Sequence, residues 1–161
     1  MYASERRNST IETPNTMSPS KQHVARPGGG QIVLIVEDDA DIRLSIANLL
    51  LDEGYLVEEA PNGRPALGLL RASRKPLVVL LDLNMPGMDG KTLLQAISDD
   101  PFHNLAARHA FILLTARDQR TLPLDFATLL TRLGVTFIAK PFDISDLLTA
   151  VAAAAARLPI T

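Results

Sequence analysis

The sequence predicts an α/β domain: a doubly wound, five-stranded parallel sheet built from five β/α units. Two observations predict this class. Short apolar runs of strand length alternate with segments of helical periodicity, and most of the runs end in a polar or charged side chain. Parallel strands joined by right-handed crossover helices all end at one edge of their sheet. The polar side chains are therefore expected to meet in one crevice at that edge.

The five expected strands are apolar and bounded by turn or capping residues. They span residues 31–36, 55–60, 77–81, 111–114 and 135–139, and Ala139 at the end of the last strand is expected to be buried. The second strand has a shorter apolar run and is more polar than the others, which is typical of a strand at a sheet edge.

The first two helices are marked by an apolar face and by capping residues. Asp39 or Asp41 is available to cap the first helix, which ends near Gly54 and has on one face Ile42, Ile46, Leu49 and Leu50. Asn62 caps the second helix. Its Pro65 falls in the first turn, where a missing N–H costs little.

Three further helices follow the third, fourth and fifth strands. The third carries Leu93, Leu94 and Ile97, and Pro101 breaks the chain beyond it. The fourth carries Leu129, Leu130 and Leu133, and it is expected to begin late, near Pro123. The last helix, residues 143–157, has an alanine-rich stretch that is apolar on all sides. A partner or self-association could cover this stretch, or alanine is present simply as a strong helix former.

Composition fits one domain of ordinary size, because the chain has 161 residues of which 47% are hydrophobic. A net charge of −2 gives no electrostatic reason to expect direct nucleic-acid binding. No cysteine is present for disulfides, thiol catalysis or zinc–thiolate sites. No apolar run is long enough to cross a membrane, and the first residues lack the apolar core of a secretion signal. We therefore expect a cytoplasmic protein.

Residues 1–30 differ in character from the rest of the chain. They are rich in Ser, Thr, Asn, Pro and Gly and show no apolar period, so we expect a disordered tail. The three glycines at residues 28–30 precede a strand instead of following one, which favours a flexible tether over a phosphate-binding loop. One domain is expected over residues 31–158, with a short end at residues 159–161.

Four of the expected strands end in potentially reactive side chains, namely Glu37, Asp38, Asp82, Thr115 and Lys140. If the strand order is the flavodoxin-like 2-1-3-4-5, the first and third strands are neighbours, and the carboxylates of Glu37, Asp38 and Asp82 meet. Carboxylates this close repel one another unless a cation lies between them, and Mg²⁺ suits such a site. Acids, a hydroxyl and an amine together are the parts of a magnesium-dependent phosphoryl site.

Four blocks carry a resemblance to a known family. They are Val36-Glu37-Asp38-Asp39, Leu81-Asp82-Leu83-Asn84-Met85-Pro86-Gly87-Met88-Asp89-Gly90, Leu114-Thr115-Ala116-Arg117 and Lys140-Pro141-Phe142. In order and spacing, residues 31–158 resemble the receiver domain of bacterial two-component response regulators, the CheY-like superfamily.

The resemblance implies a phosphorylation-activated switch in a two-component phosphorelay. Asp82 would accept a phosphoryl group from a sensor histidine kinase or a histidine phosphotransfer protein. Asp38, Asp82 and the backbone carbonyl of Asn84 would bind Mg²⁺, and Glu37 would act through a water. Lys140 would pair with the phosphoryl oxygens.

The same resemblance implies how the signal leaves the site. Thr115 and the backbones of Asn84 and Ala116 would contact the phosphoryl group, and Phe137 would swing inward. The face formed by the fourth helix, the fifth strand and the fifth helix would change and bind a downstream protein; a homodimer through that face stays open. Such a domain catalyses only its own phosphorylation and dephosphorylation. The bond before Pro141 is expected to be cis.

Alternatives remain at this point. The chain is either a stand-alone receiver or a fragment of a longer regulator, since no recognisable output domain follows. A degenerate receiver could act as a phosphorylation-independent binding module. A third alternative is a phosphohydrolase resembling the haloacid dehalogenase family, but two features of the sequence argue against it. That family has a second Asp where this chain has Asn84, and its acidic pair comes near the end of the chain, whereas Glu37 and Asp38 precede Asp82. His23, His103 and His109 lack metal-binding spacing.

Overall fold

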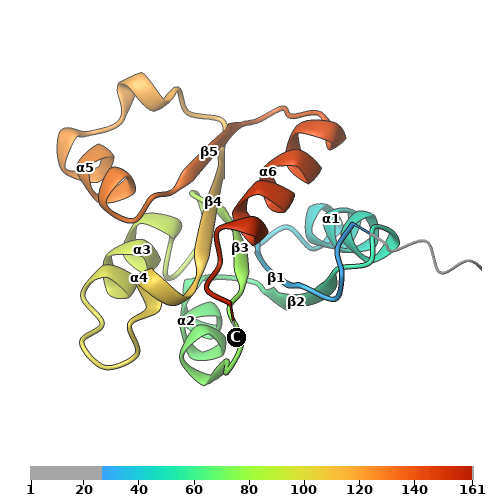
Figure 1. Ribbon diagram of the computed structural model, residues 1–161. Helices are drawn as coiled ribbons and strands as arrows, with labels where there is room; N and C mark the ends of the chain where they lie inside the picture. The colour runs from blue at the N-terminus through green and yellow to red at the C-terminus, as the bar shows by residue number, and fades with distance from the viewer. Residues whose placement is uncertain (1–26, 161) are drawn as a thin grey trace, which may run out of the picture.

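Five parallel strands form one sheet in the order β2-β1-β3-β4-β5, in a computed structural model that describes residues 27–160 (Figure 1). The strands are β1 (Ile32–Val36), β2 (Leu56–Ala60), β3 (Val78–Asp82), β4 (Ala110–Thr115) and β5 (Thr136–Ala139). The predicted fold class and strand order are confirmed, and each predicted boundary lies within one residue of the observed one.

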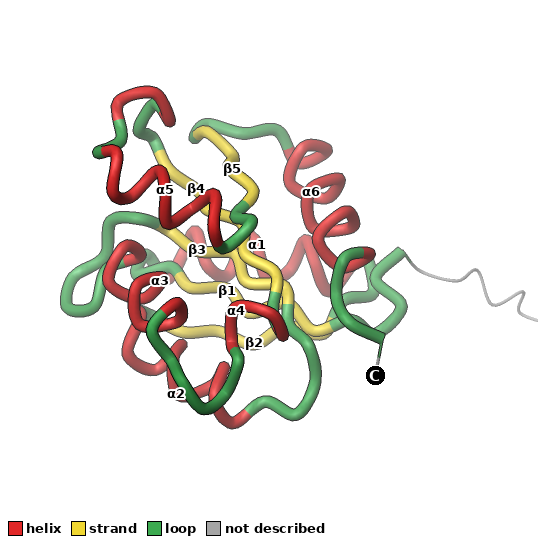
Figure 2. The backbone as a smooth tube through the Cα atoms, turned by 60° about the vertical axis from the view of Figure 1, so that its left-hand side comes forward, coloured by secondary structure: helices red, strands yellow, loops and turns green. Residues whose placement is uncertain are grey.

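Helices cover both faces of the sheet (Figures 1 and 2). One face carries α1 (Ala40–Asp52) and α6 (Ile144–Ala156); the other carries α2 (Gly63–Ala72), α3 (Gly90–Ser98), α4 (Leu105–Arg108) and α5 (Leu124–Arg132). Alternate residues of each central strand pack into opposite cores, because side chains of a strand alternate between its faces. This double burial explains why these strands are apolar at nearly every position.

Side-chain caps begin three of the helices. Asp39 accepts hydrogen bonds from two backbone N–H groups of the first turn of α1, at 2.9 and 3.0 Å, so it is the N-cap rather than Asp41. Asn62 and Asp89 cap α2 and α3 in the same way. These caps fix where each helix leaves the edge of the sheet at which β1, β2 and β3 end.

The segment after β4 departs from regular helix. A short 3₁₀ turn, η1 (Gln119–Thr121), comes first, and α5 begins only after Pro123, as predicted. Neither η1 nor α4 was predicted, because segments of three or four residues are too short to show a helical period.

Two burial predictions were wrong. Ile42 was expected on the buried face of α1 but is 42% exposed, because it faces a groove shared with Phe142 and Ile144 instead of the sheet. Ala139 was expected to be buried but is exposed, because β5 is an edge strand and its end lines open grooves. Figure 2 shows β5 at this edge, with α5 on one side and α6 on the other.

The described chain begins with a turn packed against the end of α1. The N–H of Gly28 donates to the carbonyl of Glu53 at 2.9 Å. A Cβ atom at Gly28 would lie 2.4 Å from the backbone nitrogen of Tyr55, so this close approach requires glycine. Residues 1–26, the rest of the predicted tail, lie outside the described residues. Among residues 27–160, no helix is long and apolar enough to cross a membrane.

Candidate functional site

The register of the sheet brings the predicted site residues together. Val36 of β1 is paired with Leu81 of β3, so the next residues, Glu37 and Asp82, lie side by side at the edge of the sheet where these strands end. These residues are distant in sequence, and they are neighbours only because β1 and β3 pair in the sheet.

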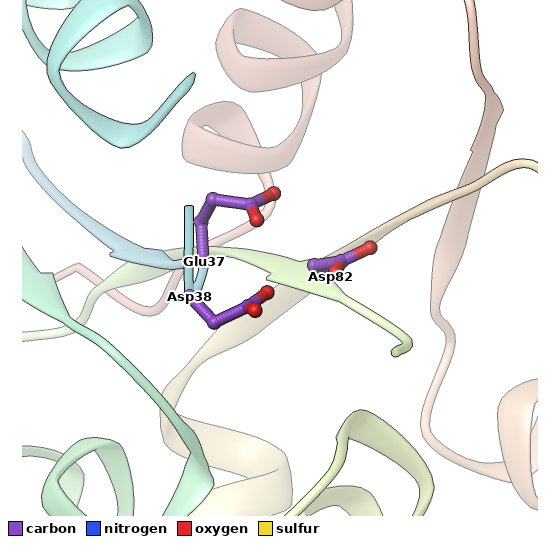
Figure 3. A group of neighbouring side chains, drawn as sticks. All are labelled: Glu37, Asp38 and Asp82. Atoms are coloured by element: carbon purple, nitrogen blue, oxygen red, sulfur yellow. The ribbon is translucent and has the colours of Figure 1, made fainter. Parts of the chain in front are cut away.

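Glu37, Asp38 and Asp82 form an acidic group at this edge (Figure 3). Each offers one carboxylate oxygen, and these oxygens all lie within 4.8 Å of one another. Glu37 and Asp82 are buried whereas Asp38 is exposed, so the group opens to solvent on the Asp38 side.

Lys140 brings a positive charge to the two buried acids. Its ammonium lies 3.2 Å from Oδ1 of Asp82 and 3.3 Å from Oε2 of Glu37. Burial lowers the pKa of Lys140, but the two carboxylates raise it by more, so the net pKa lies above the ordinary value of lysine. Lys140 is therefore charged at neutral pH.

Burial raises the pKa of the Glu37 carboxyl above its ordinary value. The backbone N–H of Asp39, which donates to Oε1 of Glu37 at 3.1 Å, and the ammonium of Lys140 oppose this shift only in part. The neighbouring charge of Asp82 adds to it. The acidic group is thus electrostatically crowded, and it favours an additional cation.

Thr115 ends β4 beside the acidic group and is fully buried. Its Oγ1 accepts a hydrogen bond from the backbone N–H of Arg117 at 3.1 Å, and its carbonyl accepts one from the N–H of Lys140 at 2.8 Å. Ala116, the next residue, is exposed. The Thr115 hydroxyl therefore connects the end of β4 to the loop that leads from the site towards α5.

Phe137 shares a sheet face with Thr115. In the β4–β5 register Leu113 is paired with Phe137 and Thr115 with Ala139, and the side chain of Phe137 packs in part against the core under α5. It is half-buried and also lines the open grooves on β5. The predicted switch pair therefore lies on two neighbouring strands.

The loop after β3 lies close against the main chain of the acidic group. Gly90, the first residue of α3, packs so tightly that a Cβ atom would lie 2.6 Å from the carbonyl oxygen of Asp82. Its N–H donates to the carbonyl of Leu83 at 3.1 Å. Asn84 is exposed on this loop, two residues after Asp82. The Lys140–Pro141 bond is cis, as predicted.

Sequence reasoning missed Arg43. Its Nη1 donates to the backbone carbonyl of Glu37 at 2.7 Å, and its Nε pairs with Oε2 of Glu59 at 2.9 Å. The available signal was a cation one helical turn after the Asp39 cap, on the helix that begins at the acidic group. Such a position is common on ordinary surface helices, so the signal is weak without the fold.

The donor set fits a magnesium ion. Mg²⁺ binds oxygen at about 2.1 Å in octahedral geometry, which places ligand oxygens roughly 3 to 4 Å apart. The carboxylate oxygens, mutually within 4.8 Å, need only a small inward movement to reach this spacing. Oxygen-only donors also favour Mg²⁺ over metals that prefer nitrogen or sulfur.

A doubly wound sheet with an acidic group, a hydroxyl and a lysine at its carboxyl edge defines a receiver-type signalling domain. The family model described as "Response regulator receiver domain" matches residues 33–152. This match covers most of the 161-residue sequence. The chain belongs to the response regulator receiver domain family, whose members signal through phosphorylation in two-component systems.

Known proteins agree with this assignment. The chain is similar to the transcriptional regulatory protein PdtaR of Mycobacterium tuberculosis, 37% identical over 127 residues that make up 78% of this chain and 57% of PdtaR. It is similar to sporulation initiation phosphotransferase F of Bacillus subtilis, 35% identical over 120 residues, covering 74% of this chain and 89% of that protein. The chain thus spans little more than half of PdtaR and most of the second relative.

Solved structures give the same result. A CheY-like receiver domain protein from Methanospirillum hungatei superposes with a TM-score of 0.65 and 33% identity, covering 77% of this chain and 93% of that one. This similarity confirms the five-stranded fold.

Proposed function

We propose that the protein is a phosphorylation-activated switch in which Asp82 accepts a phosphoryl group from the phosphohistidine of a sensor histidine kinase or a histidine phosphotransfer protein. The observation that carries this proposal is the contact of the buried Asp82 carboxylate with Lys140 inside an acidic group. The similarity to a protein named sporulation initiation phosphotransferase F supports it.

The reaction is a transfer between two nucleophiles. A carboxylate oxygen of Asp82 forms a bond to phosphorus, the bond from phosphorus to the donor's imidazole nitrogen breaks, and its electron pair returns to the imidazole. The ammonium of Lys140 lies beside the attacking carboxylate, where it pairs with the phosphoryl oxygens. Asp38, Asp82 and the backbone carbonyl of Asn84 would hold Mg²⁺, with Glu37 acting through a water. The bound ion would neutralise charge between the carboxylates and the phosphoryl oxygens.

Burial limits how the phosphoryl group can be placed. Asp82 is only 7% exposed, and the open side of the acidic group lies at Asp38 and Asn84. The donor therefore approaches from the side of the β1–α1 and β3–α3 loops. Ala116 and Asn84 are exposed residues, and their backbones supply N–H groups for the remaining phosphoryl oxygens.

The new phosphoryl group then biases a two-state element. Thr115 is the buried hydroxyl at the end of β4. Its oxygen accepts a hydrogen bond from the N–H of Arg117, and its O–H donates to a phosphoryl oxygen, which draws the side chain towards Asp82. Movement of the segment 116–123, between β4 and α5, leaves space into which half-buried Phe137 turns. The phosphoryl group shifts the equilibrium only by its differential affinity for the two arrangements.

The signal is read on the face formed by α5, β5 and α6. The helices that follow the fourth and fifth strands are α5 and α6, because the additional short helix α4 lies between α3 and β4. A downstream target protein binds this face, and a homodimer formed through the same face is the alternative. The protein acts in the cytoplasm as a switch and not as an enzyme with a separate substrate.

The test is to incubate the protein with MgCl₂ and acetyl phosphate and to follow its intact mass. We expect one added phosphoryl group that requires MgCl₂ and is lost in Asp82→Asn. If no adduct forms and beryllium fluoride does not bind either, the phosphorylation switch is excluded, and the protein is a phosphorylation-independent binding module.

A further inference from the structure

Arg43 connects three elements beneath the acidic group. It lies in the first half of α1, its Nη1 donates to the carbonyl of Glu37 at 2.7 Å, and its Nε pairs with Glu59, near the end of β2, at 2.9 Å. The side chain of Arg43 is 19% exposed whereas that of Glu59 is 43% exposed. Glu59 thus orients the guanidinium, and the guanidinium holds the main chain between β1 and α1.

Glu37 is held at all of its polar groups. Its N–H donates to the carbonyl of Ala60 at 3.1 Å, and its carboxylate contacts the N–H of Asp39 and the ammonium of Lys140. Its carbonyl is held by Arg43. The peptide plane between Glu37 and Asp38 is therefore fixed on one side by Arg43.

Asp38 depends on that plane. It is exposed, and its carboxylate makes no hydrogen bond or ion pair with residues 27–160. Its direction towards Asp82 is consequently set by the backbone that carries it, and rotation of the 37–38 peptide would turn the carboxylate into solvent.

We propose that Arg43 is a positioning residue for magnesium: by holding the Glu37 carbonyl, it keeps the Asp38 carboxylate directed at Asp82. This inference rests on the proposed function, since it assigns Mg²⁺ to the same acidic group. Hydrogen-bond partners behind metal ligands typically change metal affinity about 10- to 100-fold.

Electrostatics alone predicts that replacing Arg43 changes the affinity for Mg²⁺ in the opposite direction. Arg43 is a cation whose guanidinium contacts the main chain of the acidic group, so removing its charge should strengthen the binding of Mg²⁺ if Coulomb forces decide. Positioning predicts weaker binding after the same substitution. The direction of the change therefore separates the two roles.

The experiment is calorimetric titration of MgCl₂ into the wild-type protein and the variants Arg43→Ala, Arg43→Lys and Arg74→Ala. We expect roughly 10-fold weaker binding in Arg43→Ala, with partial recovery in Arg43→Lys, which keeps one donor. Arg74 is an exposed control of equal charge whose side chain has no polar partner in the described part of the chain, and its variant should match the wild type. Unchanged or tighter binding in Arg43→Ala would overturn the proposal.

A second measurement does not depend on the metal. Amide hydrogen exchange without Mg²⁺ should be faster at residues 37–39 in Arg43→Ala than in the wild type, and equal rates would also overturn the proposal. If the wild-type protein binds no Mg²⁺, the proposed function fails and the exchange rates alone decide whether Arg43 holds this segment. If Arg43→Ala does not fold, Arg43→Gln replaces it in both measurements.

Discussion

Lys140 and Asp82 are 58 positions apart in sequence, yet the lysine ammonium lies 3.2 Å from Oδ1 of the aspartate. The contact joins the end of β5 to the end of β3, across β4, which lies between them. It offsets part of the repulsion among the three acids, and it places a cation where a phosphoryl group bonded to Asp82 would carry negative charge. The residues of the site are thus arranged before any phosphoryl group arrives.

Magnesium should stabilise the folded protein, because the acidic group exists only when β1 and β3 are paired. A ligand that binds only the folded state adds about 2.7 kcal/mol to the free energy of unfolding at a concentration 100 times its Kd. Urea unfolding with and without MgCl₂ measures this increment. Equal urea midpoints over a wide range of MgCl₂ concentration would contradict a folded-state magnesium site.

Asp38→Asn should raise the free energy of unfolding when Mg²⁺ is absent. It should also remove the additional stability that Mg²⁺ gives to the wild-type protein. Asp38 has no cationic partner among the described residues, and its carboxylate lies within 4.8 Å of two like charges, each of which costs about 1 kcal/mol even in the dielectric of water. The same urea titrations measure both effects. A variant that keeps the full magnesium increment would show that Asp38 is not a ligand.

Thr115→Ala should separate phosphorylation from switching. Asp82 and Lys140 remain in this variant, so beryllium fluoride, an analogue of the phosphoryl group, should still bind. The change in amide exchange that we expect over residues 116–123 and β5 of the wild-type protein should be largely absent from the variant. A wild-type response in Thr115→Ala would mean that the hydroxyl does not transmit the signal.

Gly90→Ala should destabilise the protein next to the nucleophile. The new Cβ would meet two backbone atoms, the Asp82 carbonyl oxygen at 2.6 Å and the Leu83 Cα at 3.0 Å, and such overpacking costs about 1–3 kcal/mol. Gly68→Ala is the matched control: Gly68 lies inside α2 with open space around it, so the variant should gain roughly 0.5–1 kcal/mol. Urea unfolding of both variants checks the two signs, and a stabilising Gly90→Ala would refute the close approach.

The fold could be predicted from sequence because its determinants are local. Strand and helix periods, and caps such as Asp39 and Asn62, act within a few residues, and parallel topology has few allowed connections. The exposures of Ile42 and Ala139 were mispredicted, because burial of a residue at the end of an element depends on which other segment reaches it.

The site could be predicted only in part. The residues at strand ends stand out because four apolar runs of this chain each end in a potentially reactive side chain, and the sheet then brings Glu37 and Asp82 together. Arg43 gave no such signal. Its partners, a backbone carbonyl and the carboxylate of Glu59, are defined by the packing of α1 against β2 and by no local pattern.

His109 should make the protein sensitive to mild acid. Burial, with a smaller contribution from Arg108, lowers its pKa from 6.5 to about 4, and its Nδ1 accepts a hydrogen bond from the N–H of Leu77. The unfolded chain binds more protons between these two pKa values, so this contribution to stability is complete above pH 6.5 and is lost as the pH falls to about 4. The loss is on the order of 3 kcal/mol.

His109→Gln removes this titration and supplies the control. The free energy of unfolding, measured in urea between pH 7 and pH 4, should fall more steeply in the wild type than in the variant. Parallel curves would show that His109 does not titrate differently in the folded and unfolded states.

The most direct measurement identifies the phosphorylated residue in the wild-type protein. Loss of the adduct in Asp82→Asn has two explanations, since Asp82 is both the proposed nucleophile and a proposed metal ligand. Protein treated with acetyl phosphate and MgCl₂ can be reduced with sodium borohydride, which converts an aspartyl phosphate into homoserine, and then mapped by peptide mass spectrometry. We expect conversion at Asp82 alone. Conversion at Glu37, Asp38 or another residue, with Asp82 unchanged, would contradict it.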